Sequence, residues 1–161
     1  METLNSRGWL LKVGSIMSDW KEQFKENNNT ISQLDEDLVW AKKDSRQELG
    51  KWLNWDEAVA YRDACNEQNY LGFNDWRIPT KSELRNLLKN TDAYWELFMN
   101  LPSKKKRNVS NYQAGGEWSF WTSDTRYDTY AWKCYFPSCK EVCVDQQVST
   151  TGTSVRLVRD E

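Results

Sequence analysis

The sequence predicts a mixed α+β domain, with helices in the middle of the chain and short strands in most of its second half. Two capping boxes mark the helices, and aromatic and β-branched runs after residue 115 indicate the strands. Because helices and strands do not alternate, an antiparallel sheet with attached helices is favoured over a parallel, doubly wound sheet. A length of 161 residues suits one main domain.

The helices are predicted from their N-termini. Asn54 and Glu57 have the spacing of a capping box, and small and apolar residues then recur at helical intervals as far as Cys65. Cys65 is therefore interpreted as a core residue, with a functional thiol as the alternative. Thr80 and Glu83 form a second capping box directly after a proline. The apolar stripe of this second helix consists of Leu84, Leu87 and Leu88.

The strands are predicted from short runs of apolar and β-branched residues. Residues 30–33 and 38–41 are typical of a β-hairpin around an acidic turn, which lacks the regular ligand spacing of a calcium loop. Further strands are expected at 118–122, 130–135 and 154–159, and a helical turn or two at 94–99.

Residues 1–23 are predicted to form an extension that packs on the main domain, residues 24–161. The extension contains a strand candidate at 9–13. Met17, Trp20 and Phe24 recur at helical spacing, which indicates an amphipathic helix.

Composition excludes several classes of function. The chain has no histidine, which removes His-based catalytic triads and His zinc sites. A formal net charge of -2 makes a non-specific nucleic-acid binder an unfavoured interpretation. No secretory signal and no membrane-length apolar run are visible, so a cytoplasmic protein without a membrane partner is expected. The cysteines, interpreted as reduced thiols, are Cys65, Cys134, Cys139 and Cys143.

The stretch Gly-Phe-Asn-Asp-Trp-Arg-Ile-Pro-Thr at 72–80 carries a family likeness. This signature resembles the C-terminal domain of Legionella collagen-like protein and its bacterial relatives, and the likeness extends over about residues 24–160. Other matching segments occur in the family's order, at 38–40, 53–58, 118–123, 130–132 and 155–159.

The resemblance implies a C-type-lectin-like fold, with two main helices flanking a twisted antiparallel sheet. It also implies kinship with formylglycine-generating enzymes and with the variable proteins of diversity-generating retroelements. In the named member it implies binding of sulfated polysaccharides and trimer formation, so a homo-oligomer is one expectation here. Such a resemblance predicts the fold more safely than it predicts the ligand.

Each residue of the signature has a structural interpretation. Asp75 is expected to accept hydrogen bonds from backbone N–H groups or from Arg77, and Arg77 to pair with a carboxylate. Trp76 is expected to pack beneath Arg77, and Ile78 to enter the core. The signature is therefore interpreted as a mark of the fold, and the ligand site is sought elsewhere.

The leading hypothesis is a non-catalytic binding module for a protein or a (sulfated) polysaccharide, with no cofactor. An intracellular or phage-related regulator or inhibitor is one form of it. Its ligand surface is predicted in the aromatic-rich C-terminal half of this Trp-rich chain, because Tyr and Trp dominate recognition surfaces. The candidate ligand-binding residues are Tyr112, Trp118, Tyr127, Tyr130, Trp132, Tyr135 and Phe136.

Two alternatives stay open. The basic run Lys104, Lys105, Lys106 and Arg107 is either a polyanion contact or a solvated loop. Cys134 and Cys139 have the separation of the copper-binding pair in formylglycine-generating enzymes, so a copper-dependent oxidase is the enzymatic alternative. Structural thiols or a disulfide are the other interpretation of that pair.

Overall fold

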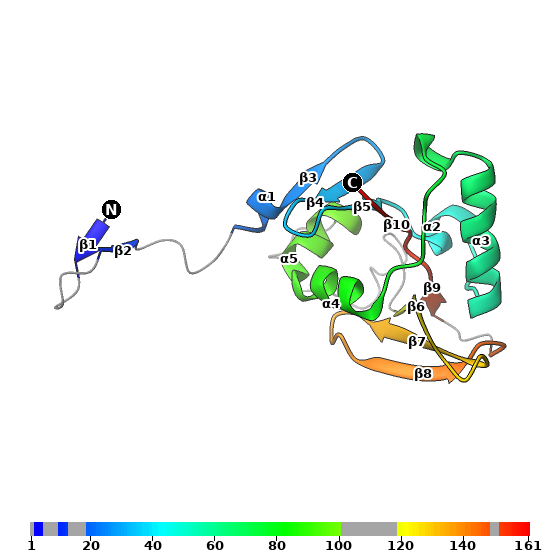
Figure 1. Cartoon of the computed structure of the whole chain (residues 1–161). Helices are drawn as coiled ribbons and strands as arrows, with labels where there is room; N and C mark the ends of the chain where they lie inside the picture. Colours follow the sequence, from blue (N-terminus) through cyan, green and yellow to red (C-terminus); the bar gives the residue numbers. More distant parts are fainter. Residues whose placement is uncertain (1, 5–9, 13–18, 101–118, 149–151) are drawn as a thin grey trace.

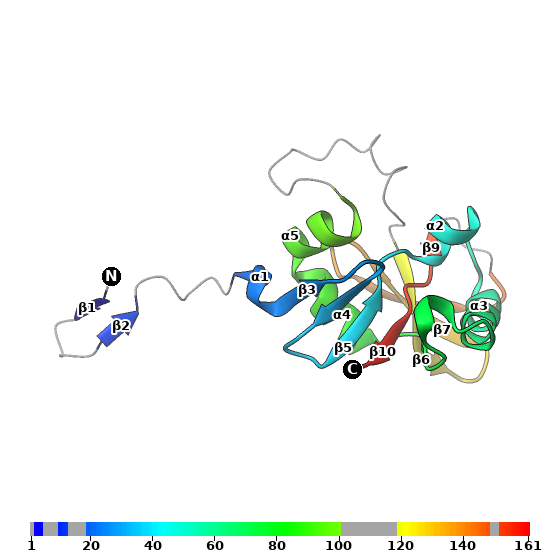
Figure 2. The same cartoon turned by 90° about the horizontal axis from the view of Figure 1, so that it is seen from above.

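The computed structural model describes residues 2–4, 10–12, 19–100, 119–148 and 152–161 (Figures 1 and 2). It confirms the mixed α+β architecture of C-type-lectin-like type. Besides a short hairpin of β1 (Glu2–Leu4) and β2 (Leu10–Lys12), the fold contains two four-stranded sheets.

The first sheet has the strand order β10-β5-β4-β3 and is antiparallel throughout. Its strands β4 (Thr30–Gln33) and β5 (Leu38–Ala41) form the predicted hairpin, with Gln33 opposite Leu38. The strands at its edges are β3 (Phe24–Glu26) and β10 (Val158–Asp160).

The second sheet has the order β8-β7-β6-β9. Strands β6 (Ser119–Arg126), β7 (Tyr130–Tyr135) and β8 (Glu141–Asp145) are antiparallel neighbours, and β9 (Thr153–Ser154) runs parallel to β6. The predicted strand at 154–159 is thus divided between β9 and β10, because this segment leaves the second sheet and enters the first.

Both predicted capping boxes are present. At the start of α3 (Trp55–Glu67), Asn54 Oδ1 accepts from the Glu57 N–H at 2.8 Å and Glu57 Oε2 accepts from the Asn54 N–H at 2.9 Å. Thr80 and Glu83 exchange the same pair of bonds at the start of α4 (Lys81–Lys89). Such boxes satisfy backbone N–H groups that a helix leaves unpaired.

The shorter helices complete the fold. They are α1 (Trp20–Gln23), α2 (Ser45–Leu49), the 3-10 turn η1 (Tyr70–Gly72), α5 (Thr91–Ala93) and the π-helical η2 (Tyr94–Phe98). The helix predicted through Met17, Trp20 and Phe24 is wrong at its C-terminal end, because Phe24 is extended and pairs with Gln33 in the first sheet. Met17 lies outside the described residues.

Two apolar clusters fill the interior. The first contains the leucines of α4 together with Ile31 and Trp40 of the first sheet and Phe120 of the second. The second surrounds Trp76 and Trp121 and includes Ala58 and Cys65 of α3, which confirms Cys65 as a core residue. Helix α3 and the pair α4–α5 lie on opposite sides of β10 (Figures 1 and 2).

Part of the N-terminal extension contacts the domain. Trp20 packs against the first apolar cluster, which contains Phe24, the first residue assigned to the main domain. The division of the chain at residue 23 stays a prediction. Within the described residues, no helix combines the length and the apolar composition that a membrane crossing needs.

A buried arginine links the last segment of the chain to the first sheet. Arg156 has no exposed surface, and its Nη1 donates to the backbone carbonyls of Ala41 and Lys42 at 3.0 and 2.6 Å. Its Nη2 lies 3.4 Å from Asp44 Oδ2 and 3.2 Å from the Tyr94 hydroxyl. Its guanidinium also lies 4.7 Å from the centre of the Phe98 ring.

Candidate functional site

The signature at 72–80 fixes the fold, as expected. The Trp76 side chain is buried, its Nε1 donates to the Tyr70 carbonyl at 2.8 Å, and its backbone exchanges two hydrogen bonds with the Asn66 amide. Ile78 is buried as predicted. Trp76 therefore links η1, which its indole contacts, to α3, which its backbone contacts.

The charges of the signature are paired on the surface. Arg77 donates to both Glu83 carboxylate oxygens at 2.8 Å and to Asp160 at 2.7 Å, which confirms the expected carboxylate pairing. Of the two donors expected for Asp75, a backbone N–H is present, but Arg77 is wrong, because Asp75 instead accepts two side-chain bonds from Arg159 at 2.7 and 3.0 Å. Those bonds lower the pKa of Asp75.

Glu83 is held as a carboxylate. Burial raises its pKa, but hydrogen bonds from Arg77 and from the Thr80 backbone outweigh burial, and the net pKa is lowered. A carboxylate that is ionised and engaged in this way serves as a structural anchor.

Two of the predicted ligand-binding residues, Tyr127 and Tyr130, lie exposed at the turn between β6 and β7. Tyr127 is 74% exposed and Tyr130 is 42% exposed, which makes them two of the six exposed large hydrophobic side chains among the described residues. The guanidinium of Arg126 lies 4.8 Å from the centre of the Tyr127 ring. Tyr127 and Asp128 both have left-handed backbone angles, with φ of 54° and 57°.

Trp132 extends this surface along β7. It lies two residues from Tyr130, on the same face of the strand, and is half-buried. The ammonium group of Lys81 lies 4.0 Å from the centre of its ring. Tyr130, Trp132 and their neighbour Tyr127 therefore form what we call the turn surface, together with Arg126.

The other predicted ligand residues are placed differently. Tyr135 is half-buried and, by strand alternation, faces the opposite side of β7 from Tyr130 and Trp132. Phe136 is 3% exposed and packs against Tyr94 and Trp95, with ring centres 4.5 and 5.0 Å away. This burial corrects the prediction for Phe136, whose ring is core. Tyr112, Trp118 and the basic run 104–107 lie outside the described residues.

The cysteines are free thiols in the structure. Burial, followed by the nearby charge of Glu141, raises the pKa of Cys134 to about 12. Burial also raises the pKa of Cys139, which is half-buried. The described residues contain no group of three or more Cys, Asp or Glu side chains placed to hold a metal ion.

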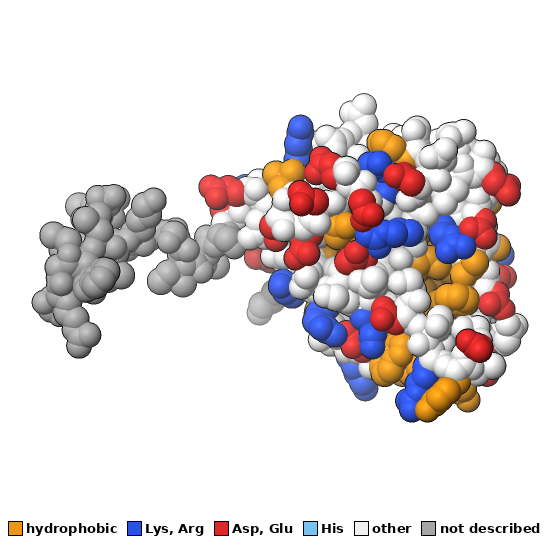
Figure 3. All heavy atoms as spheres, in the orientation of Figure 1, with side chains coloured by type: hydrophobic (Ala, Val, Ile, Leu, Met, Phe, Trp, Pro, Cys, Tyr) orange, Lys and Arg blue, Asp and Glu red, His pale blue; other side chains and the backbone are white. Residues whose placement is uncertain are grey.

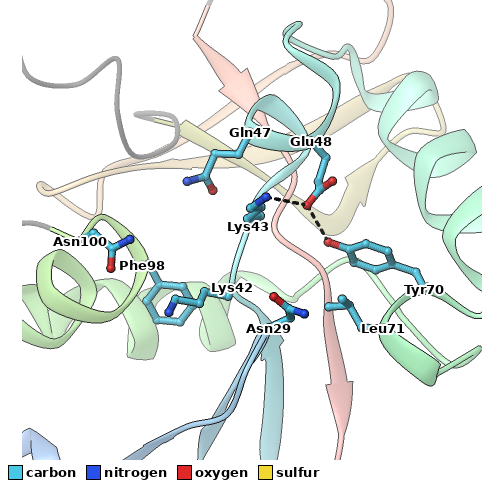
Figure 4. A pocket seen from close by; sticks show the side chains of 9 residues that line it. All are labelled: Asn29, Lys42, Lys43, Gln47, Glu48, Tyr70, Leu71, Phe98 and Asn100. Carbon is cyan, nitrogen blue, oxygen red and sulfur yellow. Dashed lines mark hydrogen bonds and ion pairs between the residues drawn. The ribbon is translucent and has the colours of Figure 1, made fainter.

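The structure also contains a polar cavity of about 440 Å³ that sequence reasoning missed (Figure 4). Its walls come from four separate segments, so no local motif could have marked it. It lies beside α2, η1 and the end of η2. The lining residues are Asn29, Lys42, Lys43, Gln47, Glu48, Tyr70, Leu71, Phe98 and Asn100.

Glu48 organises one wall of this cavity. The Tyr70 hydroxyl donates to Glu48 Oε1 at 3.1 Å, and the Lys43 ammonium lies 3.9 Å from the same oxygen. Figure 4 shows both side chains pointing toward Glu48. Burial and then the Glu48 charge raise the pKa of Tyr70, so its hydroxyl remains a hydrogen-bond donor at neutral pH. Across the cavity, Lys42 pairs with Glu26.

Comparison with known proteins agrees with the fold. The profile of the Lcl C-terminal domain matches residues 29–159, which include the signature, the polar cavity and the turn surface. No curated protein matches the chain. The match covers most of the sequence, and the chain therefore belongs to the Lcl C-terminal domain family.

Proposed function

We propose that this domain is a non-catalytic binding module for a protein partner, with the turn surface at the centre of the contact. The observation that carries the proposal is the 74% exposure of Tyr127 at the turn between β6 and β7, beside a second exposed tyrosine. Tyrosine gives large contact area at a small entropy cost, because its side chain has only two rotatable angles.

The backbone of the turn supports a recognition role. A left-handed φ is uncommon for a large residue such as Tyr127, and costs of this kind concentrate at binding sites. The turn is closed by a bond from the Thr129 N–H to the Tyr127 carbonyl at 2.7 Å. The Gln146 N–H also donates to the Thr129 carbonyl, at 2.9 Å. These bonds order the loop before binding, which reduces the entropy lost on association.

The charges around the tyrosines favour a protein over a sulfated polysaccharide. Arg126 is basic, whereas Asp128 and Asp145, the latter opposite Tyr130 across the ladder, are acidic. Figure 3 shows acidic and basic side chains interspersed on the face in view. A polyanion favours a cluster of one sign, while mixed charges with tyrosines are typical of protein interfaces.

The state of the reactive groups supports a non-catalytic role. The raised pKa of Cys134 keeps it a thiol at neutral pH, and thiolates are the species that react or bind copper. The unpaired cysteines also support a reducing compartment, as an intracellular regulator or inhibitor would occupy.

The test begins with affinity capture from the source organism, followed by titration of the purified partner. We expect Tyr127→Ser with Tyr130→Ser to weaken binding by at least roughly 30-fold, since buried tyrosine anchors contribute about 2 kcal/mol or more. Leu34→Ser is the matched control. Leu34 is 45% exposed, which is similar to Tyr130, but it lies at the β4–β5 turn. This substitution should leave affinity unchanged.

Other outcomes count against the proposal. If both variants bind the partner equally well, the turn surface is not the contact. If heparin or dextran sulfate binds the wild type and the double variant alike, and no protein is captured, the family's polyanion ligand is favoured and the contact lies elsewhere. Size-exclusion chromatography of the isolated domain distinguishes a second copy of this chain from a foreign partner.

A further inference from the structure

The outer edge of β8 carries an inference that rests on the proposed function and names the kind of segment that the partner supplies. We propose that β8 binds an extended segment of the partner protein, with basic residues at its ends, as a further strand of the second sheet. Strand β8 lies at the end of the order β8-β7-β6-β9. Within the described residues, no element lies beyond it (Figure 1).

The backbone of β8 presents a row of free hydrogen-bonding groups on this edge. The residues that flank the strand, Lys140 and Gln146, both form backbone bonds to β7, at 2.9 Å. Bonded positions alternate along an antiparallel ladder, so Glu141, Cys143 and Asp145 direct their N–H and C=O groups away from β7. The Asp145 carbonyl accepts from the turn that follows, at 3.3 Å. Both backbone groups of Glu141 and of Cys143 therefore remain for a partner strand, together with the Asp145 N–H.

The edge lacks the devices that commonly prevent strand addition. Proteins protect open edges with proline, with lysine or with a β-bulge. Strand β8 has the sequence Glu-Val-Cys-Val-Asp, and its register with β7 is unbroken from residue 141 to residue 145. Its two valines are β-branched and favour the extended conformation. The edge is therefore regular and open to pairing.

The turn surface continues onto β8. Tyr130 lies directly opposite Asp145 and Trp132 directly opposite Cys143, so these side chains share one face of the sheet. A strand added beside β8 extends the same face by about 5 Å. A partner segment that pairs with β8 therefore lies next to the tyrosines at the centre of the proposed contact.

The charges of β8 favour a basic segment over a second copy of this chain. Glu141 already pairs with Arg85, but the Asp145 carboxylate accepts from the Gln147 N–H at 2.8 Å and forms no ion pair in the described part of the chain. Antiparallel pairing of two copies over the whole strand places Glu141 opposite Asp145 of the other copy. Like charges directly opposite are destabilising, whereas a lysine or arginine opposite Asp145 gains an ion pair.

The experiment is an NMR titration of the full chain with the blocked peptide KVTVK. Paired with β8, its valines lie beside the valines of the strand and its lysines beside the acidic ends. We expect saturable shifts and slower hydrogen exchange at the backbone amides of 141, 143 and 145, with little change at 142 and 144, because the first set points outward. If about 10 mM peptide, well above a Kd of roughly 1 mM, produces no such alternation, the proposal is wrong.

Two further peptides test the two parts of the proposal. KVPVK has proline at its centre, which removes a donor to the edge, and should bind at least roughly tenfold more weakly. Equal binding of KVPVK overturns strand addition. EVTVE places acids at both ends and should also bind more weakly, because one of them then lies beside Asp145. Equal binding of EVTVE overturns the preference for a basic segment.

Matched substitutions at Cys143 extend the test to the captured partner. Cys143→Pro removes an outward N–H and no bond to β7, while Cys143→Thr keeps that N–H. The proline variant should weaken binding of both KVTVK and the partner roughly tenfold, and the threonine variant should leave both unchanged. If Cys143→Pro fails to fold, judged by fast exchange of the amides of 142 and 144, the alternation in the wild type decides.

The outcomes separate this inference from the proposed function. Tyr127→Ser with Tyr130→Ser should leave peptide binding unchanged. If that variant loses the partner while Cys143→Pro retains it, the turn surface is the contact and strand addition is wrong. If KVTVK gives the alternation but no captured protein depends on the tyrosines, strand addition stands and the proposed function fails. If the outward amides are protected in the free protein and size-exclusion chromatography shows a dimer, a second copy occupies the edge and the foreign segment is wrong.

Discussion

Two arginines three residues apart illustrate two ways of anchoring the same segment. Arg156 is fully buried among aromatic rings and backbone carbonyls, whereas the Arg159 side chain is 17% exposed and forms a surface pair with Asp75. A buried charge requires all its partners, because water cannot replace a lost one. A surface charge exchanges a protein partner for water at little cost. Arg156 is therefore expected to contribute much more than Arg159 to the free energy of unfolding.

The largest expected effect comes from the buried site. Arg156→Met removes the counter-charge of Asp44, whose side chain is also fully buried, and should lower the free energy of unfolding by about 3–5 kcal/mol. Urea unfolding followed by tryptophan fluorescence measures this change. Adding Asp44→Asn removes the orphaned charge while keeping an N-cap side chain, so the double variant should be more stable than Arg156→Met alone. A double variant that is less stable contradicts the account.

An intermediate effect is expected for Arg77, because its carboxylate partner lies between the two extremes in burial. The Arg77 side chain is 32% exposed, but it donates two parallel bonds to Glu83, which is 19% exposed, whereas Asp44 beside Arg156 is fully buried and Asp75 beside Arg159 is 53% exposed. Arg77→Ala should therefore cost about 1–2 kcal/mol in urea unfolding, less than Arg156→Met but more than loss of an exposed pair. Equal costs at Arg77 and Arg156 would show that burial does not decide the difference.

A smaller effect, part of the Arg77 contribution, depends on pH. Because the pKa of folded Glu83 is lowered from its ordinary 4.5, its carboxylate stabilises the fold above about pH 4.5. That stability is lost as the pH falls through the lowered pKa. The stability difference between wild type and Glu83→Gln should be constant from pH 7 to about pH 5 and shrink toward pH 3. Thermal unfolding across this range tests it, and a constant difference contradicts it.

The smallest effect is expected at the surface pair. Arg159→Ala should cost less than about 1 kcal/mol, although its guanidinium also lies 4.2 Å from the centre of the Phe73 ring. Lys51→Ala, which removes another exposed ion pair, provides the reference value. If Arg159→Ala costs as much stability as Arg77→Ala, exposure of the carboxylate partner does not reduce the contribution of an ion pair in this domain.

Local signals predicted the parts of the fold that local contacts build. Asn54 with Glu57 and Thr80 with Glu83 lie within one helical turn, so their spacing alone locates α3 and α4. The partner of Asp75 could not be found in this way, because Arg159 is 84 residues distant in sequence. Nothing in the sequence indicates that Asp75 contacts Arg159 and not Arg77, which is two residues away.

The candidate sites show the same limit. Tyr127 and Tyr130 were predicted from composition, and the turn places them together. Strand alternation places Phe136 on the same face as Tyr130 and Trp132, so this pattern alone could not separate its buried ring from their more exposed ones. The polar cavity was not predictable, because Asn29, Lys43, Tyr70 and Asn100 come from distant segments that only the completed fold brings together.

The segment at 153–160 has a consequence for the order of folding. Residues 153–160 pair with β6 in one sheet and β5 in the other, and the carbonyls of Val155 and Leu157 accept from Ser45 and Ala41. These partners are far away in sequence, so each contact closes a long loop and costs more chain entropy than a hairpin such as β4–β5. We therefore expect the two sheets to be joined late in folding, and until then the edge of β5 that pairs with β10 is open.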